Sequence, residues 1–168
     1  PPRLYDLTTL QRECNRIYGY TAQQTLGYLQ SLYEKKLATY PRTDSQYLTE
    51  DMQATAASLI LWLRDNMPFG KGCLEEPDID RVTDGSKVTD HHAIIPTVEI
   101  ARTDLSALPS GERDVLTLIA MRLLCATGQA HRFEAVTAVL DCAGHSFTAK
   151  GKTVLQAGWK EIERLYRM

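Results

Sequence analysis

Residues 110–128 read SGERDVLTLIAMRLLCATG, the most continuously apolar helical pattern in the chain. Apolar side chains recur here at helical spacing and cover more than half of the circumference of such a helix: Val115, Leu116, Leu118, Ile119, Leu123 and Ala126. We expect Ser110 to cap the helix and Gly128 to end it. A helix that is apolar on most sides is buried, so this stretch predicts a helical core.

Two helices are predicted near the start of the chain. The first follows Thr8, whose spacing to Gln11 suggests a capping box, and it ends at Gly19, which can adopt a left-handed conformation. The second begins with a capping box formed by Thr21 and the glutamine three residues later, and its apolar stripe continues to Leu37. The shared spacing predicts two neighbouring amphipathic helices.

A third helix is predicted after Thr49, with acidic residues in its first turn, where the helix dipole favours negative charge. It should end before Met67-Pro68, because proline cannot continue a helix. Residues 69–86 hold several glycines and many acidic residues, and we expect a loop there.

The pattern changes near Arg132. Residues 133–142 alternate and are rich in Val, Thr and Ala, as in a strand, and residues 147–149 and 153–155 predict two more short strands. We therefore expect a mainly α protein, with a helical domain over residues 1–130 followed by a short β-rich segment, residues 131–168, from a neighbouring domain.

The composition is that of a soluble globular protein, with 43% hydrophobic and 24% charged residues. No apolar run is long enough to cross a bilayer, and no signal peptide is expected, because no apolar stretch follows Pro1-Pro2-Arg3. The net charge of −2 argues mildly against nucleic-acid binding. However, 13 of the 21 acidic residues lie between residues 47 and 114, so a basic face elsewhere remains open.

The four cysteines do not predict a zinc site, because none of them forms a CxxC pair. We expect free, mostly buried thiols in a reducing compartment. The residues are Cys14, Cys73, Cys125 and Cys142.

The segment with the clearest chemical potential is residues 39–45, TYPRTDS. A phenol hydroxyl has an ordinary pKa of about 10, so its attack on a phosphodiester needs positive charge nearby. Arg42 can supply that charge to Tyr40 and to the phosphate oxygens. Thr43, Asp44 and Ser45 add short hydrogen-bonding groups that could fix the loop. The alternative is that the Tyr-Pro-Arg triplet serves only packing and turn formation.

A second candidate segment contains His91 and His92, preceded by Asp90. One histidine could donate to a phosphate oxygen, and the carboxylate could orient the other. A metal site is the rival interpretation, although no third ligand has suitable spacing. A capped turn before a short strand explains the same residues without any function.

Taken together, these segments resemble the active-site region of type IA DNA topoisomerases, and most closely the topoisomerase III branch. The matches follow the family order along nearly the whole chain: residues 7–11, 19–22, 32–34, 40–45, 91–97, 147–151 and 158–159. The resemblance implies that the β-rich segment, residues 131–168, belongs to the gate domain.

The resemblance also implies roles for individual residues. Tyr40 attacks single-stranded DNA and takes the 5′-phosphoryl group as a phosphotyrosine, and resealing needs no ATP because the covalent bond stores the energy. Arg42 holds the scissile phosphate and His91 stabilises the transition state. At the DNA-binding surface, His92 occupies a more variable family position, and Gln11 and Thr39 are further candidates.

The family's acidic Mg²⁺-binding module is not found in this sequence. We expect no metal ligands and no cofactor here, Mg²⁺ in the full-length enzyme, and an isolated fragment that neither cleaves nor relaxes DNA. The expected partners are single-stranded DNA and the remaining domains of the parent topoisomerase, with no membrane and a cytoplasmic, nucleoid-associated location. The alternatives are a non-catalytic module that binds single-stranded DNA and an unrelated helical interaction domain.

Overall fold

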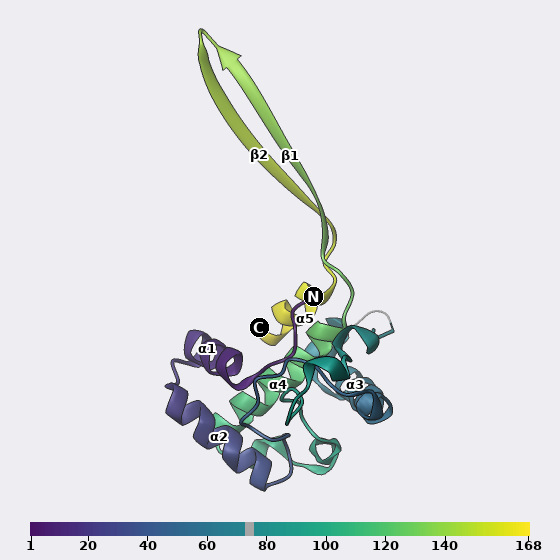
Figure 1. The fold of residues 1–168 in the computed structure, drawn as a ribbon. Coiled ribbons are helices and arrows are strands. Elements are labelled where there is room, and N and C mark those ends of the chain that lie inside the picture. The colour runs from purple at the N-terminus through teal and green to yellow at the C-terminus, as the bar shows by residue number, and fades with distance from the viewer. Residues whose placement is uncertain (73–75) are drawn as a thin grey trace.

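The computed structural model describes residues 1–72 and 76–168. It shows a helical body from which a long β-hairpin projects (Figure 1). The body contains α1 (Leu7–Tyr18), α2 (Ala22–Glu34), α3 (Gln53–Asn66), α4 (Ser110–Thr127) and α5 (Trp159–Tyr166). Among the described residues, no helix has both the length and the apolar character needed to cross a membrane.

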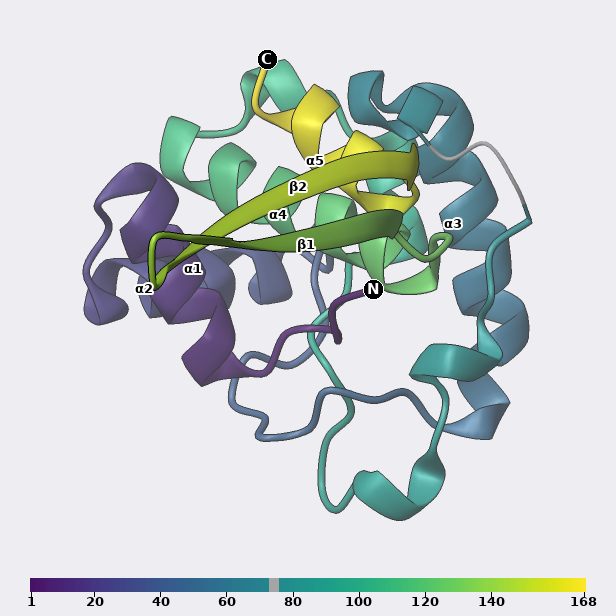
Figure 2. The ribbon, with the colours of Figure 1, turned by 90° about the horizontal axis from the view of Figure 1, so that it is seen from above.

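Helix α4 forms the centre of the body, as its sequence pattern predicts. Most of its side chains are buried, and it packs against α2, α3 and α5. Figure 2 shows α1 and α2 on one side of α4 and α3 on the other. Gly128 ends the helix as expected, but Ser110 is its first residue rather than its cap, which is Pro109. The apolar circumference of α4 therefore determines the arrangement of the body.

The first two helices confirm one predicted capping box and correct the other. Thr21 caps α2, and its hydroxyl accepts a hydrogen bond from the Gln24 N–H at 3.1 Å. Helix α1 begins earlier than predicted, because the Asp6 carboxylate accepts from the Thr9 N–H at 2.7 Å and caps the helix instead of Thr8. Gly19 takes the predicted left-handed conformation, with φ of 73°.

The remaining helical predictions hold with small changes. A 3₁₀ turn at Glu50–Met52 precedes α3, which ends before Met67 as expected. Helix α2 stops at Glu34, so Leu37 is buried beyond its end rather than inside it. The predicted loop contains short 3₁₀ turns at Pro68–Gly72, Asp80–Val82 and Gly85–Lys87. Two further 3₁₀ turns, Val98–Arg102 and Leu105–Ala107, precede α4.

The predicted strands form one hairpin rather than three short strands. β1 (Arg132–Cys142) and β2 (His145–Gln156) pair antiparallel along their whole length, and Ala143 and Gly144 form the turn with positive φ. Gly151, predicted to separate two strands, pairs with Val136 inside β2.

The end of the chain returns to the helical body, which the sequence patterns did not reveal. Helix α5 packs against α4 and the 3₁₀ turn at Pro68–Gly72, and Ile162 is buried there. Gly158 begins α5 with φ of 57°, and a Cβ at this position would lie 2.4 Å from the Ala130 carbonyl oxygen. Residues 131–168 thus contain both an exposed hairpin and a helix of the body; their assignment to a gate domain remains a prediction.

Three of the cysteines lie in the described part of the chain, and two of them, Cys14 and Cys142, are free thiols. Cys14 and Cys125 are buried and Cys142 is exposed on the hairpin. Burial raises the pKa of the Cys14 thiol to about 12. Cys73 lies outside the described residues, together with Leu74 and Glu75.

Candidate active site

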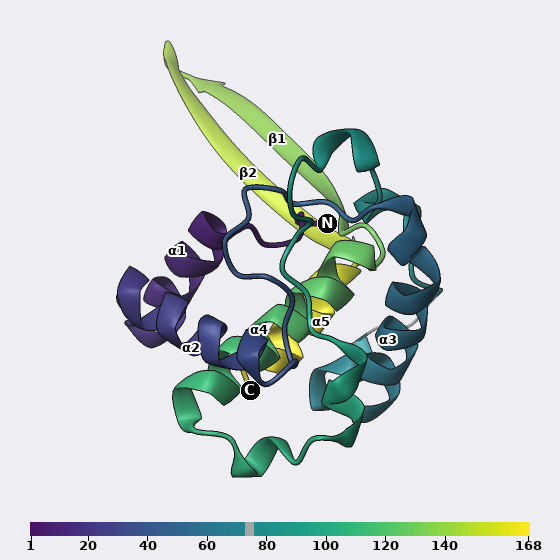
Figure 3. The same cartoon turned by 60° about the horizontal axis from the view of Figure 1, so that its bottom comes forward.

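Two extended segments, residues 37–48 and 91–97, run side by side between α2 and α3 and carry the predicted site residues (Figure 3). Isolated β-bridges join Ala38 to Pro96 and Tyr5 to Ile94. The Thr39 N–H donates to the Ile95 carbonyl at 3.0 Å. Backbone hydrogen bonds therefore fix segments that are about fifty residues apart in the sequence.

Threonine and serine side chains lock these segments together, as predicted for Thr43 and Ser45. The Thr43 hydroxyl donates to the His91 carbonyl at 2.8 Å and accepts from the Ser45 N–H at 3.1 Å. The Ser45 hydroxyl donates to the Lys87 carbonyl at 2.9 Å. Because Thr43 and Ser45 are buried, these bonds are shielded from water and hold the loop that carries Tyr40.

Tyr40 is half-buried between two other rings. The His91 ring lies 4.0 Å from it, centroid to centroid, with an angle of 30° between the planes. The Tyr33 ring lies 5.5 Å away and nearly perpendicular, at 86°. Within the described residues, no hydrogen bond engages the Tyr40 hydroxyl, so ring contacts orient the side chain and leave its oxygen available.

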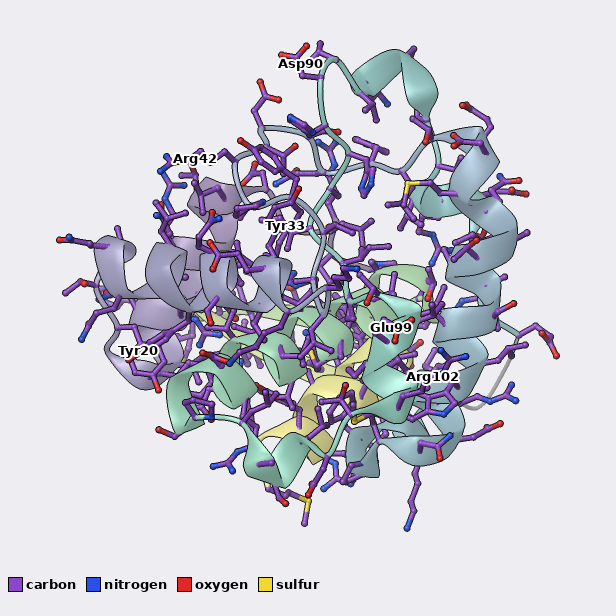
Figure 4. The ribbon with its side chains drawn as sticks, turned by 90° about the horizontal axis from the view of Figure 1, so that it is seen from below. Tyr20, Tyr33, Arg42, Asp90, Glu99 and Arg102 are labelled. Carbon is purple, nitrogen blue, oxygen red and sulfur yellow. The ribbon has the colours of Figure 1, made fainter. Side chains whose placement is uncertain are left out.

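Arg42 and His91 line the same open cavity of about 410 Å³ beside this loop. Asp6 and Thr8, at the start of α1, also line the cavity, and so does Asp90. Figure 4 shows Tyr33, Arg42 and Asp90 on the side of the body seen from below. A permanently charged guanidinium and an imidazole thus face one solvent-filled space next to the tyrosine, an arrangement suited to an anionic group such as a phosphate.

The other predicted residues have local structural partners. The Thr39 hydroxyl donates to the Ala93 carbonyl at 3.2 Å and accepts from the Ile95 N–H at 3.0 Å. The Gln11 amide donates to the Ala22 carbonyl at 3.0 Å and ties α1 to α2. The His92 Nδ1 lies 2.8 Å from the Ala93 carbonyl oxygen. None of these contacts tests a role in DNA binding, which remains a prediction for all three predicted residues.

The described residues do not form a metal site. Across residues 1–72 and 76–168, no group of three or more His, Cys, Asp or Glu side chains is placed to hold a metal ion. In the same part of the chain, Asp90 makes no hydrogen bond or ion pair with either histidine, so the suggested orienting contact is not formed. These side chains therefore do not fit a Mg²⁺ ion, and no step is assigned to one here.

Tyr33 is the neighbour of Tyr40 that the sequence patterns failed to distinguish. It lies on the helical stripe of α2, and that spacing alone indicates a packing residue. Its position next to Tyr40 depends on the turn after α2, where Lys36 takes a left-handed conformation with φ of 62°. Only its place in the segment Leu32–Glu34, seven residues before the nucleophile candidate, could have signalled the contact.

Comparisons with known proteins identify the family of the chain. The family model described as DNA topoisomerase matches residues 1–167. DNA topoisomerase 3 from Bacillus cereus is 40% identical over 166 residues, which cover 96% of this chain and 22% of that protein. DNA topoisomerase 3 from Bacillus subtilis is 40% identical over 176 residues, which cover 96% of this chain and 23% of that protein.

Full-length topoisomerase I from Thermotoga maritima shares the fold, with a TM-score of 0.72 over 98% of this chain and 27% of that one, at 23% identity. The chain belongs to the type IA DNA topoisomerase family. Within that family it lies on the topoisomerase III branch. It spans less than a quarter of the length of the two Bacillus relatives.

Proposed function

We propose that this chain supplies the nucleophile of an ATP-independent topoisomerase that cuts and rejoins single-stranded DNA through a 5′-phosphotyrosine on Tyr40. The observation that supports this most directly is the position of Tyr40, stacked on His91 at 4.0 Å, next to the cavity that Arg42 and His91 line. The cavity is open to solvent, and the Tyr40 hydroxyl has no competing hydrogen bond among the described residues.

The proposed reaction exchanges one phosphodiester for another. The Tyr40 oxygen bonds to phosphorus, the bond from phosphorus to the 3′ oxygen breaks, and that oxygen leaves as a hydroxyl after taking a proton. The Arg42 guanidinium neutralises charge on the phosphate oxygens, and the His91 imidazole donates a hydrogen bond to them. The reverse attack by the 3′-hydroxyl restores the strand, so no ATP is needed.

The proton that leaves Tyr40 needs an acceptor. Among the described residues, no carboxylate is in hydrogen-bond contact with the Tyr40 hydroxyl. We therefore propose that the acceptor and a Mg²⁺ ion belong to another module of a longer protein, acting in the cytoplasm at the nucleoid. On this basis, the 168 residues alone neither cleave nor relax DNA.

The hairpin supports the proposal that residues 131–168 contribute to a gate domain. Every residue from 132 to 155 is exposed, and one face of the hairpin is mostly apolar: Val136, Ala138, Leu140, Phe147 and Ala149. An isolated two-stranded hairpin is at best marginally stable in water. Other strands of the parent protein are the proposed cover, and limited proteolysis should cut the hairpin in this chain but not in the complete topoisomerase.

A covalent-trapping assay tests the role of Tyr40. The complete topoisomerase is mixed with a labelled single strand and denatured, and the attached label is measured by gel electrophoresis. Tyr40→Phe should abolish the adduct while DNA binding is retained. Tyr28→Phe is the matched control, because Tyr28 packs against Tyr20, away from Tyr40. An adduct that persists in Tyr40→Phe contradicts the proposal. DNA binding without any adduct in the unmodified enzyme favours the non-catalytic module.

A further inference from the structure

The eight tyrosines of the chain differ sharply in what surrounds their rings. Tyr5 is buried against Arg122. A cluster on α1, α2 and α5 engages four more through ring contacts and hydrogen bonds: Tyr18, Tyr20, Tyr28 and Tyr166. Lys87 lies over the ring of Tyr47. Apart from Tyr40, the remaining tyrosine is Tyr33, which belongs to none of these groups and whose ring contacts that of Tyr40.

Tyr33 is 41% exposed, although it lies beside the half-buried Tyr40. The perpendicular contact, at 86° and 5.5 Å between centroids, leaves at least one face of the Tyr33 ring uncovered by Tyr40. In the described part of the chain, no hydrogen bond holds its hydroxyl. A partly exposed aromatic ring therefore lies beside the ring of the proposed nucleophile, Tyr40.

An unpaired cationic residue also follows Tyr33 closely in the sequence. Lys36 follows three residues later and is exposed, and no ion pair among the described residues neutralises its ammonium group. By contrast, Lys35 is paired with Glu112 at 2.5 Å. Proteins commonly hold single strands with cationic side chains and with aromatic rings, because every base has a face that can stack.

We propose that Tyr33 is a stacking platform for the base of a nucleotide that adjoins the phosphate attacked by Tyr40. This rests on the proposed function, since it requires DNA at Tyr40. The ring lies one side chain away from the nucleophile, so a base on a flanking nucleotide can reach it while the phosphate occupies the Arg42 and His91 cavity. Stacking fixes the strand without selecting a sequence, so Tyr33 binds an unpaired base of any kind.

The test uses the complete topoisomerase with Tyr40→Phe, so that no cleavage disturbs binding. Affinity for a labelled oligonucleotide with one cleavage position is measured by fluorescence anisotropy for Tyr33→Leu, which keeps apolar packing against Tyr40 but removes the aromatic face. Tyr33→Phe should recover the affinity lost in Tyr33→Leu. Leu61→Ala, at a 39% exposed position on α3, controls for loss of an exposed apolar side chain.

Oligonucleotides that lack one base in turn on either side of the cleavage position complete the test. Tyr33→Leu should weaken binding of the intact strand about 5- to 100-fold, and the difference should disappear for one abasic strand only. Equal affinity of Tyr33→Leu for the intact strand overturns the inference. A loss that persists on every abasic strand also overturns it, because Tyr33 then only positions Tyr40. Adduct formation on Tyr40 is scored separately, so the proposed function can stand if this inference fails.

Discussion

Thr43→Val removes the hydroxyl that joins the Tyr40 loop to the His91 segment while keeping the shape of the side chain. Two hydrogen bonds are lost, at 2.8 Å to the His91 carbonyl and at 3.1 Å from the Ser45 N–H. Thr43 is only 8% exposed, so water cannot readily replace them. The backbone bond from the Leu7 N–H to the Thr43 carbonyl remains.

The expected cost follows from leaving these buried groups unpaired. Each costs about 1–3 kcal/mol when no new partner is found, and relaxation brings the sum to about 2–4 kcal/mol. A domain of this size has about 5–15 kcal/mol of stability, so the variant should stay folded. Its melting temperature should fall by about 4–16 °C, at about 2–4 °C per kcal/mol.

Circular dichroism of the isolated chain measures the melting temperature, and covalent trapping in the complete topoisomerase measures the site. Below the melting transition, the rate of adduct formation should fall more than 10-fold, because His91 loses its fixed distance from Tyr40. A tenfold fall in rate corresponds to the loss of about 1.4 kcal/mol of transition-state stabilisation. Thr103→Val, which removes a 2.8 Å hydrogen bond to Glu99 remote from the site, is the control.

The reasoning is refuted if Thr43→Val melts at the temperature of the unmodified chain. It is also refuted if its adduct rate falls no further than that of Thr103→Val, because the bond would then contribute stability without organising the site.

Three other perturbations test parts of the structure away from Tyr40. Lys35→Met should lower the free energy of unfolding in urea by about 1–2 kcal/mol, because it leaves the buried Glu112 carboxylate without its cation. Glu112→Gln should cost less, since the 43% exposed lysine can be hydrated. Equal effects of the two variants would argue against a buried ion pair. Gly158→Ala should lower the stability measured in thermal melts by about 1–3 kcal/mol, because Gly158 has a positive φ and a Cβ there would lie close to the Ala130 carbonyl oxygen. An unchanged melting temperature would contradict this backbone conformation. Iodoacetamide at pH 8 should label Cys142 well before Cys14, because burial raises the pKa of the Cys14 thiol from 9.0 to about 12 and keeps it protonated. The stability linked to this protonation is present below pH 9 and is lost between pH 9 and 12. Equal labelling of the two cysteines in peptide mass mapping would refute this prediction.

The helices were predictable because burial imposes a 3.6-residue period on them. The stripe of α4 and the Thr21 capping box are local signals, and the structure confirms both. The hairpin was divided wrongly because its residues are exposed on both faces, so no burial pattern marks its length, and Gly151 then looks like a break. Helix α5 was missed because it is short and buries only Ile162.

The sequence predicts the members of the candidate site but not their geometry. Tyr40, Arg42 and His91 stand out through residue type and resemblance to a family. Their proximity depends on bridges such as Ala38 to Pro96, which join distant segments and leave no local trace in the sequence. The same limit hid Tyr33, whose spacing indicates only a helix face.

Tyr40 and His91 sit on one rigid unit, since the Thr43 hydroxyl and the bridged strands couple their two segments. If a DNA end becomes attached to Tyr40 as proposed, a movement of this unit relative to the rest of the enzyme would carry the imidazole along with the cut end. In that reaction the phosphate would stay in contact with Arg42 and His91, and only the free 3′ end would have to return. Fidelity of rejoining then becomes a matter of docking two bodies, rather than of rebuilding a binding pocket at each cycle.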